Sequence, residues 1–169
     1  MVTAFLLLGS NLGDRSDHLE KARLQIGLCA GRLFIASSIY ETAAWGHIPQ
    51  RPFLNQVVCI ETTLTPEQLL KIIQAVESSL GRVRSEKWAA RTLDIDILFY
   101  GNEIIDTPDL VIPHPAIQQR RFTLVPLIEV APGFVHPVLN KTVEVLLREC
   151  DDTLAVNVFE SDGGAGREN

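Results

Sequence analysis

The chain has 169 residues, which is enough for one domain with a sizeable core and short for two. Hydrophobic residues make up 46% and charged residues 21%, ordinary values for a soluble globular domain that exclude collagen-like, coiled-coil and wholly disordered chains. Fifteen Lys and Arg against 21 Asp and Glu leave a net charge of −6, which argues against a partner nucleic acid bound through bulk charge. An anionic ligand must therefore be held by a local cluster of cations.

The cysteines and the apolar segments bear on the compartment. Cys29, Cys59 and Cys150 are widely spaced in apolar stretches, so we expect buried, reduced thiols and a cytoplasmic location. The apolar run at residues 5–8 is not a signal peptide, because no basic region precedes it and a Gly-Ser-Asn turn ends it. No stretch approaches the roughly 18 apolar residues of a membrane span, so we expect no membrane partner.

The first residues predict a strand, a turn and a helix. Residues 2–8 form a continuous apolar run that is typical of a buried strand, and residues 9–13 predict a turn. Apolar residues then recur at helical spacing over residues 19–29, with Asp14 or Ser16 as the cap of the helix.

Two further strands follow, separated by a loop. Residues 32–42 and 53–64 are rich in β-branched and aromatic side chains, and we expect them to pair as an antiparallel ribbon. The connection at residues 43–52 is too long and too rich in Gly and Pro for a tight hairpin, so it predicts a mobile loop.

The next segment predicts a helix, a second loop and a strand. Residues 65–81 open with a Thr-Pro-Glu-Gln capping box, carry apolar residues at helical spacing and close at a Gly. Residues 82–91 show neither the helical nor the strand periodicity of apolar residues, and they include four basic residues and a Trp. We therefore expect a second mobile loop. Residues 94–100 predict a strand, with a short strand at 103–105.

This order of elements predicts the fold class. Strand, helix, strand, strand, helix, strand is the βαββαβ order of ferredoxin-like sandwiches. We therefore expect an α+β fold with an antiparallel sheet, helices on one side and C-terminal extra elements, among them a helix at 142–150. We expect one domain over residues 1–160 and a flexible tail over 161–169, which is small, polar and rich in Gly.

Common nucleotide-binding motifs are absent from the sequence. It contains no Gly-x-x-x-x-Gly-Lys-Ser/Thr loop and no Gly-x-Gly-x-x-Gly fingerprint. Residues 9–13 join a strand to a helix, where a phosphate could bind the helix N-terminus. They include no Lys, so a purely structural turn is the better interpretation.

Two aspartates carry the strongest chemical signal. Side chains alternate along a strand, so Asp94 and Asp96 share one face while Ile95 and Ile97 face the core. Two carboxylates roughly 7 Å apart repel each other unless a cation lies between them. Mg²⁺ prefers such oxygen ligands and keeps coordination positions for substrate phosphates. The alternative is a solvated sheet face with two ordinary aspartates.

Cations cluster around this pair in an otherwise acidic chain. Arg82, Arg84, Lys87 and Arg91 precede the aspartates, and guanidinium groups suit bidentate phosphate binding. His114 stands between two prolines, which hold it in a stiff extended segment. A metal with several arginines is typical of a polyphosphate site, although His114 by itself could equally be a turn residue without a ligand.

Aromatic residues supply a second half of the candidate site. Phe53 and Asn55 share a strand face, so one can stack on a flat ring while the other reads the edge of that ring. Phe122 could close the sandwich, and Trp45 and Trp88 lie in the two expected loops, where Trp is more typical of a lid than of the core.

Residues 87–98, Lys-Trp-Ala-Ala-Arg-Thr-Leu-Asp-Ile-Asp-Ile-Leu, resemble the signature of the 6-hydroxymethyl-7,8-dihydropterin pyrophosphokinase family of the folate pathway. Further stretches agree with the family pattern in order: residues 9–13, 40–42, 53–55, 81–84, 111–114 and 120–122. The resemblance runs from Val2 to about Cys150 and is far more specific than any single motif.

The resemblance implies a monomeric enzyme that transfers the pyrophosphoryl group of ATP to the hydroxymethyl group of a dihydropterin and releases AMP. Two Mg²⁺ ions would be held by Asp94 and Asp96. The residues implied to bind ATP are Gln74, Glu77, Arg82, Arg84, Arg91, Ile97, Leu110, Val111, His114 and Arg120, of which Arg82, Arg84, Arg91 and His114 are the implied catalytic residues. The residues implied to bind the pterin are Thr42, Ala43, Trp45, Phe53, Asn55, Trp88 and Phe122.

Two other functions compete with this one. A ferredoxin-like module that senses a nucleotide without chemistry explains the order of elements, but not the two carboxylates beside four cations. A two-metal phosphohydrolase explains the carboxylates but does not account for the aromatic residues that could stack on a ring. Product identity separates the three.

Overall fold

An antiparallel sheet forms the middle layer of the structure, a computed structural model that describes residues 1–43, 49–81 and 92–161. The strands of this sheet are β1 (Val2–Ser10), β2 (Arg32–Ala36), β3 (Tyr40–Thr42), β4 (Phe53–Thr62), β5 (Asp94–Tyr100) and β8 (Val156–Val158). They run in the order β5-β1-β4-β3-β8, and β2 pairs with the other end of β4. Strands β5, β1, β4 and β2 pair in this order and all antiparallel, which is the strand arrangement of a βαββαβ unit. This arrangement confirms the expected fold class.

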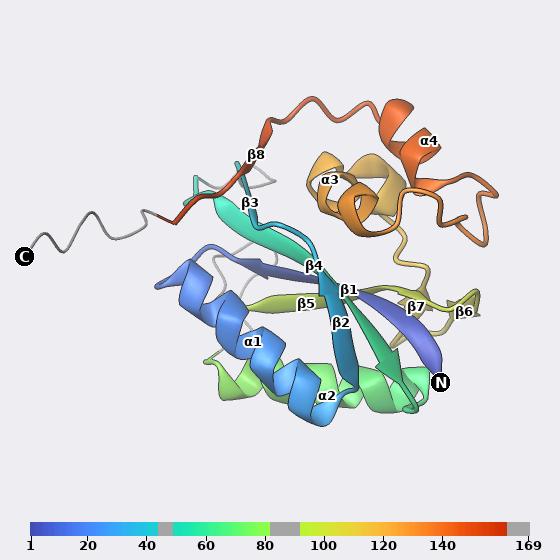
Figure 1. Ribbon diagram of the computed structural model, residues 1–169, viewed down its shortest axis with the longest axis horizontal. Helices are drawn as coiled ribbons and strands as arrows, with labels where there is room; N and C mark the ends of the chain where they lie inside the picture. The colour runs from blue at the N-terminus through green and yellow to red at the C-terminus, as the bar shows by residue number, and fades with distance from the viewer. Residues whose placement is uncertain (44–48, 82–91, 162–169) are drawn as a thin grey trace, which may run out of the picture.

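Two helices, α1 (Arg15–Cys29) and α2 (Pro66–Ser79), cover one face of the sheet (Figure 1). Asp14 caps α1 by accepting a hydrogen bond from the Asp17 backbone N–H, and Thr65 and Gln68 form the expected capping box on α2. The apolar stripes of both helices pack with the inward residues of β1, β4 and β5 in one core cluster.

The C-terminal helices α3 (Arg121–Val130) and α4 (Val143–Arg148) cover the opposite face (Figure 1). Their buried residues form a second core cluster with Phe5, Val57 and Phe99 of the sheet. The sheet is therefore buried on both sides, and the two faces are distinguished by which helices cover them.

The expected strand at residues 32–42 is interrupted between β2 and β3. The side chain of Ser37 accepts a hydrogen bond from the Val57 backbone N–H at 3.0 Å, while the Ser37 carbonyl accepts one from the Gln56 side chain at 2.7 Å. Because side chains are the partners of the Val57 N–H and the Ser37 carbonyl, the regular pairing of β2 with β4 ends at this point. The chain pairs with β4 again as β3.

The remaining elements connect β5 to α3. Strand β6 (Ile105–Asp106) pairs with β7 (Val111–Ile112) in a small hairpin, and a 3-10 helix, η1 (Ile117–Gln119), follows. The short strand that the sequence predicts at 103–105 therefore lies one or two residues later, since Gly101 and Asn102 form the turn out of β5.

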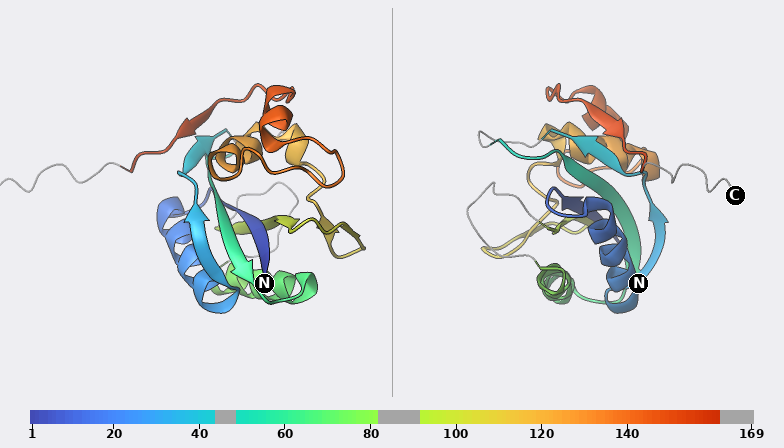
Figure 2. Two further views of the ribbon diagram at one scale, coloured as in Figure 1. Left: turned by 45° about the vertical axis from the view of Figure 1, so that its right-hand side comes forward. Right: turned by 90° about the vertical axis from the view of Figure 1, so that its left-hand side faces the viewer.

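Strand β8 is an element that the sequence did not predict. It pairs with β3 at the edge of the sheet (Figure 2), and the register places Thr42 opposite Val156. A strand of three residues is too short to show the alternation of apolar and polar residues, so only its pairing with β3 identifies it. Positions 162–169 of the expected tail lie outside the described residues.

The prediction of buried cysteines is confirmed only in part. Cys59 is buried as predicted, but Cys29, in the last turn of α1, is exposed. Within residues 1–43, 49–81 and 92–161, no helix combines the length and apolar character needed to cross a membrane.

Candidate active site

Asp94 and Asp96 begin β5 and point to the face of the sheet that α3 and α4 cover. The alternate residues Ile95 and Ile97 belong to the core cluster on the opposite face, as the alternation predicts. Both carboxylates are half-buried. Two acidic groups are thus held side by side by one strand on a partly solvent-accessible surface.

Helix α2 supports this strand through a buried carboxylate. Glu77 is 4% exposed, and its Oε2 accepts a hydrogen bond from the backbone N–H of Ile95 at 3.1 Å. The bond falls between the two aspartates and fixes the start of β5 against α2. Gln74 lies three residues earlier on the same helix and is half-buried.

His114 faces the carboxylates from the segment after β7. Its backbone N–H donates to the Leu98 carbonyl at 3.0 Å, and its Nδ1 accepts from the Ala116 N–H at 3.2 Å. The neutral ring therefore carries its proton on Nε2, which lies 3.9 Å from Asp96 Oδ2. This distance is too long for a direct hydrogen bond.

Burial and the positive charge of Arg120 lower the pKa of His114 to about 4, against a smaller opposing effect of Asp94. The imidazole is therefore neutral at pH 7. It offers an N–H donor beside the carboxylates without adding a charge.

Arg120 and Phe122 come from the start of α3. Arg120 occupies the N-cap position, and its Cζ lies 5.6 Å from the centroid of the Phe122 ring. Its charge acts on His114, so this arginine, one of the residues implied to bind ATP, lies near the imidazole that faces the aspartates. The other cations and the two tryptophans, at Arg82, Arg84, Lys87, Arg91, Trp45 and Trp88, lie outside the described residues.

The predicted pterin-binding residues of β3 and β4 lie together. Asn55 is 4% exposed, and its Nδ2 donates to Thr42 Oγ1 at 3.3 Å. Phe53 lies opposite Thr42 in the β3–β4 register and is half-buried, and Ala43 follows Thr42 as an exposed residue. A carboxamide has two donors and one acceptor oxygen, so the Asn55 side chain retains hydrogen-bonding capacity beyond this bond.

Gly9 joins the two halves of the site, and the sequence analysis did not single it out as a site residue. It lies opposite Asn55 on β4 and opposite Asp94 on β5. A Cβ atom at Gly9 would lie 2.9 Å from Asn55 Oδ1 and 3.8 Å from Phe53 Cδ1. Its missing side chain therefore makes room for the Asn55 carboxamide against the β1 backbone. A Gly inside a buried strand is the signal that could have identified it.

The hydrogen bonds of the turn at residues 9–13 support its structural interpretation. Asn11 donates from Nδ2 to Gln50 Oε1 at 2.8 Å and to the Arg51 carbonyl at 3.3 Å, and Arg51 donates to the Gly13 carbonyl at 3.2 Å. The turn thus binds the chain segment that enters β4.

The three apolar residues that the resemblance implies to bind ATP differ in burial. Ile97 is buried in the core cluster, Leu110 packs against that cluster, and Val111 is exposed. Ile97 lies on β5, Leu110 directly before β7 and Val111 on β7. All three therefore belong to the part of the chain that leads from the aspartates to His114.

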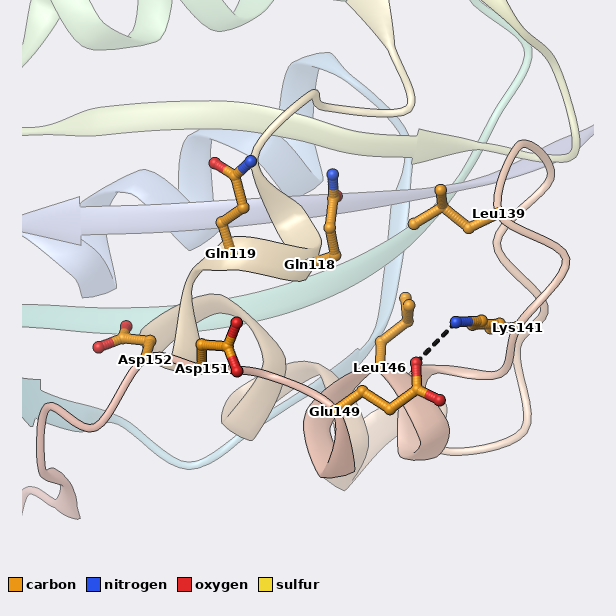
Figure 3. Close-up of a pocket in the computed structure, with 8 residues that line it drawn as sticks. All are labelled: Gln118, Gln119, Leu139, Lys141, Leu146, Glu149, Asp151 and Asp152. Carbon is orange, nitrogen blue, oxygen red and sulfur yellow. Dashed lines mark hydrogen bonds and ion pairs between the residues drawn. The ribbon is translucent and has the colours of Figure 1, made fainter.

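A separate cavity of about 540 Å³ lies between η1 and α4, and none of the predicted site residues lines it (Figure 3). Its lining residues are Gln118, Gln119, Leu139, Lys141, Leu146, Glu149, Asp151 and Asp152. Lys141 pairs with Glu149 at 2.7 Å, and the Asp152 carboxylate accepts the N–H groups of Arg121 and Leu154. The lining has an excess of negative charge, which does not suit a polyphosphate.

Comparisons with known proteins show which family this chain resembles. Residues 5–132 match the model of 7,8-dihydro-6-hydroxymethylpterin-pyrophosphokinase. Similar curated proteins include two named 2-amino-4-hydroxy-6-hydroxymethyldihydropteridine pyrophosphokinase. The one from Haemophilus influenzae is 44% identical over 89% of this chain and 95% of its own length. The one from Aquifex aeolicus is 41% identical over 85% of this chain and 89% of its own length.

Solved structures share the fold. The wild-type HPPK-DHPS of Plasmodium falciparum with pteroate superposes with a TM-score of 0.71 at 18% identity, covering 87% of this chain. This chain spans 42% of that protein's length, so the match concerns one part of a longer chain. By the family model and the curated relatives together, the chain belongs to the 7,8-dihydro-6-hydroxymethylpterin-pyrophosphokinase family.

Proposed function

We propose that the chain transfers the pyrophosphoryl group of ATP to 6-hydroxymethyl-7,8-dihydropterin, giving the pterin diphosphate and AMP in folate biosynthesis. The observation that carries this assignment is the placement of Asn55, Gly9 and Asp94 on three neighbouring strands. A carboxamide that suits the edge of a heterocycle thus lies one strand away from a carboxylate that suits a metal-bound phosphate, with Gly9, which has no side chain, between them.

Mg²⁺ is the metal we propose for this site. Among the described residues there is no group of three or more His, Cys, Asp and Glu that could hold a metal ion. Asp94 and Asp96 alone fit Mg²⁺, which is commonly held by one or two carboxylates and completes its coordination with water and substrate phosphates. Bound there, two ions would neutralise the triphosphate and polarise the acceptor oxygen.

The protein's own groups bind and orient the two substrates. Asn55 reads the edge of the pterin, and Phe53 and Phe122 stack on its faces. His114 donates a hydrogen bond from Nε2 to a phosphate oxygen, and Arg120 supplies positive charge. Because in-line transfer depends on alignment and charge neutralisation, these groups act by positioning and electrostatics.

The proposal also includes further residues, the oligomeric state and the location of the enzyme. Arg82, Arg84 and Arg91 bind the triphosphate, Trp45 and Trp88 contact the pterin, and Gln74, Ile97, Leu110 and Val111 contribute to the ATP side. The enzyme works as a cytoplasmic monomer on small molecules, without nucleic acid or membrane.

Product analysis tests the assignment. The protein is incubated with ATP, Mg²⁺ and 6-hydroxymethyl-7,8-dihydropterin, and the nucleotides and pterins are separated by chromatography. AMP and pterin diphosphate in equal amounts support the proposal. ADP or inorganic phosphate without pterin diphosphate indicates a hydrolase, and nucleotide binding without turnover indicates a sensing module.

A further inference from the structure

Arg15, the first residue of α1, joins three segments that border the proposed pterin side of the site. Its side chain is only 13% exposed. Nη1 donates to the Pro52 carbonyl at 2.8 Å and lies 2.8 Å from Glu41 Oε2. Its Cζ also lies 5.5 Å from the centroid of the Phe159 ring. One guanidinium thus holds a carbonyl, a carboxylate and an aromatic ring from distant parts of the chain.

Two of these partners adjoin residues proposed to bind the pterin. Pro52 directly precedes Phe53, and Glu41 directly precedes Thr42, whose hydroxyl accepts the hydrogen bond of Asn55. Arg15 therefore ties together the ends of β3 and β4 that carry the proposed stacking ring and its carboxamide.

Phe159 brings the C-terminal segment into the same contact. Its backbone N–H donates to the Ile39 carbonyl at 2.8 Å, and its side chain packs against the core cluster beneath α1. The preceding strand, β8, extends the sheet beyond β3. This segment lies outside residues 5–132, which match the family model.

We propose that Arg15 is a positioning residue for the pterin and that β8 with Phe159 forms part of the same frame. The inference rests on the proposed function and adds residues to its pterin side. A buried guanidinium that bonds two oxygen atoms fixes their separation, and its loss leaves both acceptors without this donor. The Asn55 and Phe53 side chains then lose their alignment, while the aspartates on β5 keep theirs.

Arg32 provides a matched control at the opposite end of β4. It also donates to a strand carboxylate, with Nε 3.0 Å from Glu61 Oε2, and its Cζ lies 5.7 Å from the Phe34 ring centroid. Its side chain is 68% exposed, and its partners border none of the proposed site residues. An Arg32→Met variant therefore removes a similar set of contacts away from the site.

The test measures KM for each substrate, kcat and thermal unfolding for the full-length protein. For Arg15→Met we expect the KM for the dihydropterin to rise roughly tenfold, as the loss of charge-assisted hydrogen bonds of about 1.5 kcal/mol implies, with the KM for ATP unchanged. Arg15→Lys keeps the charge and should recover part of the loss. Phe159→Ala should raise the same KM by a smaller factor, and Arg32→Met should leave it unchanged.

Equal increases of both KM values, or the same kinetics for Arg15→Met and Arg32→Met, would overturn the inference. If Arg15→Met does not fold, Arg15→Lys and Phe159→Ala decide it by the same comparison. A wild-type protein that releases no AMP contradicts the proposed function instead. Calorimetric titration of the dihydropterin into wild type and the variants then tests the frame without turnover.

Discussion

Gly9 lies opposite Asn55 in the register of β1 and β4, so close that a Cβ atom at Gly9 would be 2.9 Å from Asn55 Oδ1. The β4 backbone and the Thr42 hydrogen bond hold this carboxamide, which leaves it little freedom to move away. The position of Asn55 therefore depends on the absence of a side chain on the neighbouring strand.

A Gly9→Ala substitution should impair pterin binding. The added methyl group displaces the Asn55 oxygen, so we expect the KM for the dihydropterin to rise at least about tenfold, a loss of about 1–3 kcal/mol. Gly27→Ala is the control, because a Cβ at this exposed helical position meets no atom within 4 Å. Steady-state kinetics of both variants would contradict the prediction if they behaved alike.

An Asn55→Ala substitution should weaken the pterin complex and leave the nucleotide complex intact. The variant removes the donors and acceptor that read the ring edge, a loss of about 1–3 kcal/mol. Isothermal titration with a non-hydrolysable ATP analogue and then with the pterin separates the two affinities. Equal losses for both ligands would refute the separate binding roles of the two halves of the site.

An Asp96→Asn substitution should abolish turnover by removing a proposed metal ligand while keeping the side-chain shape. We expect kcat to fall by about a thousandfold, a magnitude typical for the loss of several kcal/mol of electrostatic stabilisation. Asp106→Asn, on the exposed hairpin, is the control. Most of the activity surviving at saturating Mg²⁺ would count against the metal role.

Acid should destabilise the protein partly through His136, which is 4% exposed. Its Nδ1 accepts the N–H groups of Val138 and Leu139 at 3.2 and 3.1 Å, which only an unprotonated nitrogen can do. Burial lowers the pKa of His136 in the folded state. Its contribution is therefore complete above the unfolded-state pKa of about 6.5 and is lost as the pH falls through the lower folded-state pKa.

Urea unfolding at pH 7.5 and at pH 5 measures this effect. In His136→Asn the side-chain oxygen replaces Nδ1 as acceptor and does not titrate. The free energy of unfolding of this variant should fall less between the two pH values than that of the wild type, since about 1–2 kcal/mol of hydrogen bonding no longer depends on protonation. Parallel pH dependences would rule out His136 as the group responsible.

Local patterns were sufficient for much of the fold. The capping box of α2 needs only Thr65 and Gln68, and both of its bonds form as predicted. The long interrupted strand shows the limit of such reasoning. Ser37 ends β2 because its hydroxyl meets the backbone of Val57, a contact between residues far apart in the chain.

The sequence by itself determined that Asp94 and Asp96 share a face, because the alternation of a strand is a property of its own backbone. It also determined the order of elements and, through the resemblance, the family. Only the tertiary structure decided that Gly9 lies between Asn55 and Asp94 and that Arg15 holds Pro52, Glu41 and Phe159 together. These relations depend on strand register and on long-range packing, which no single segment of the chain encodes.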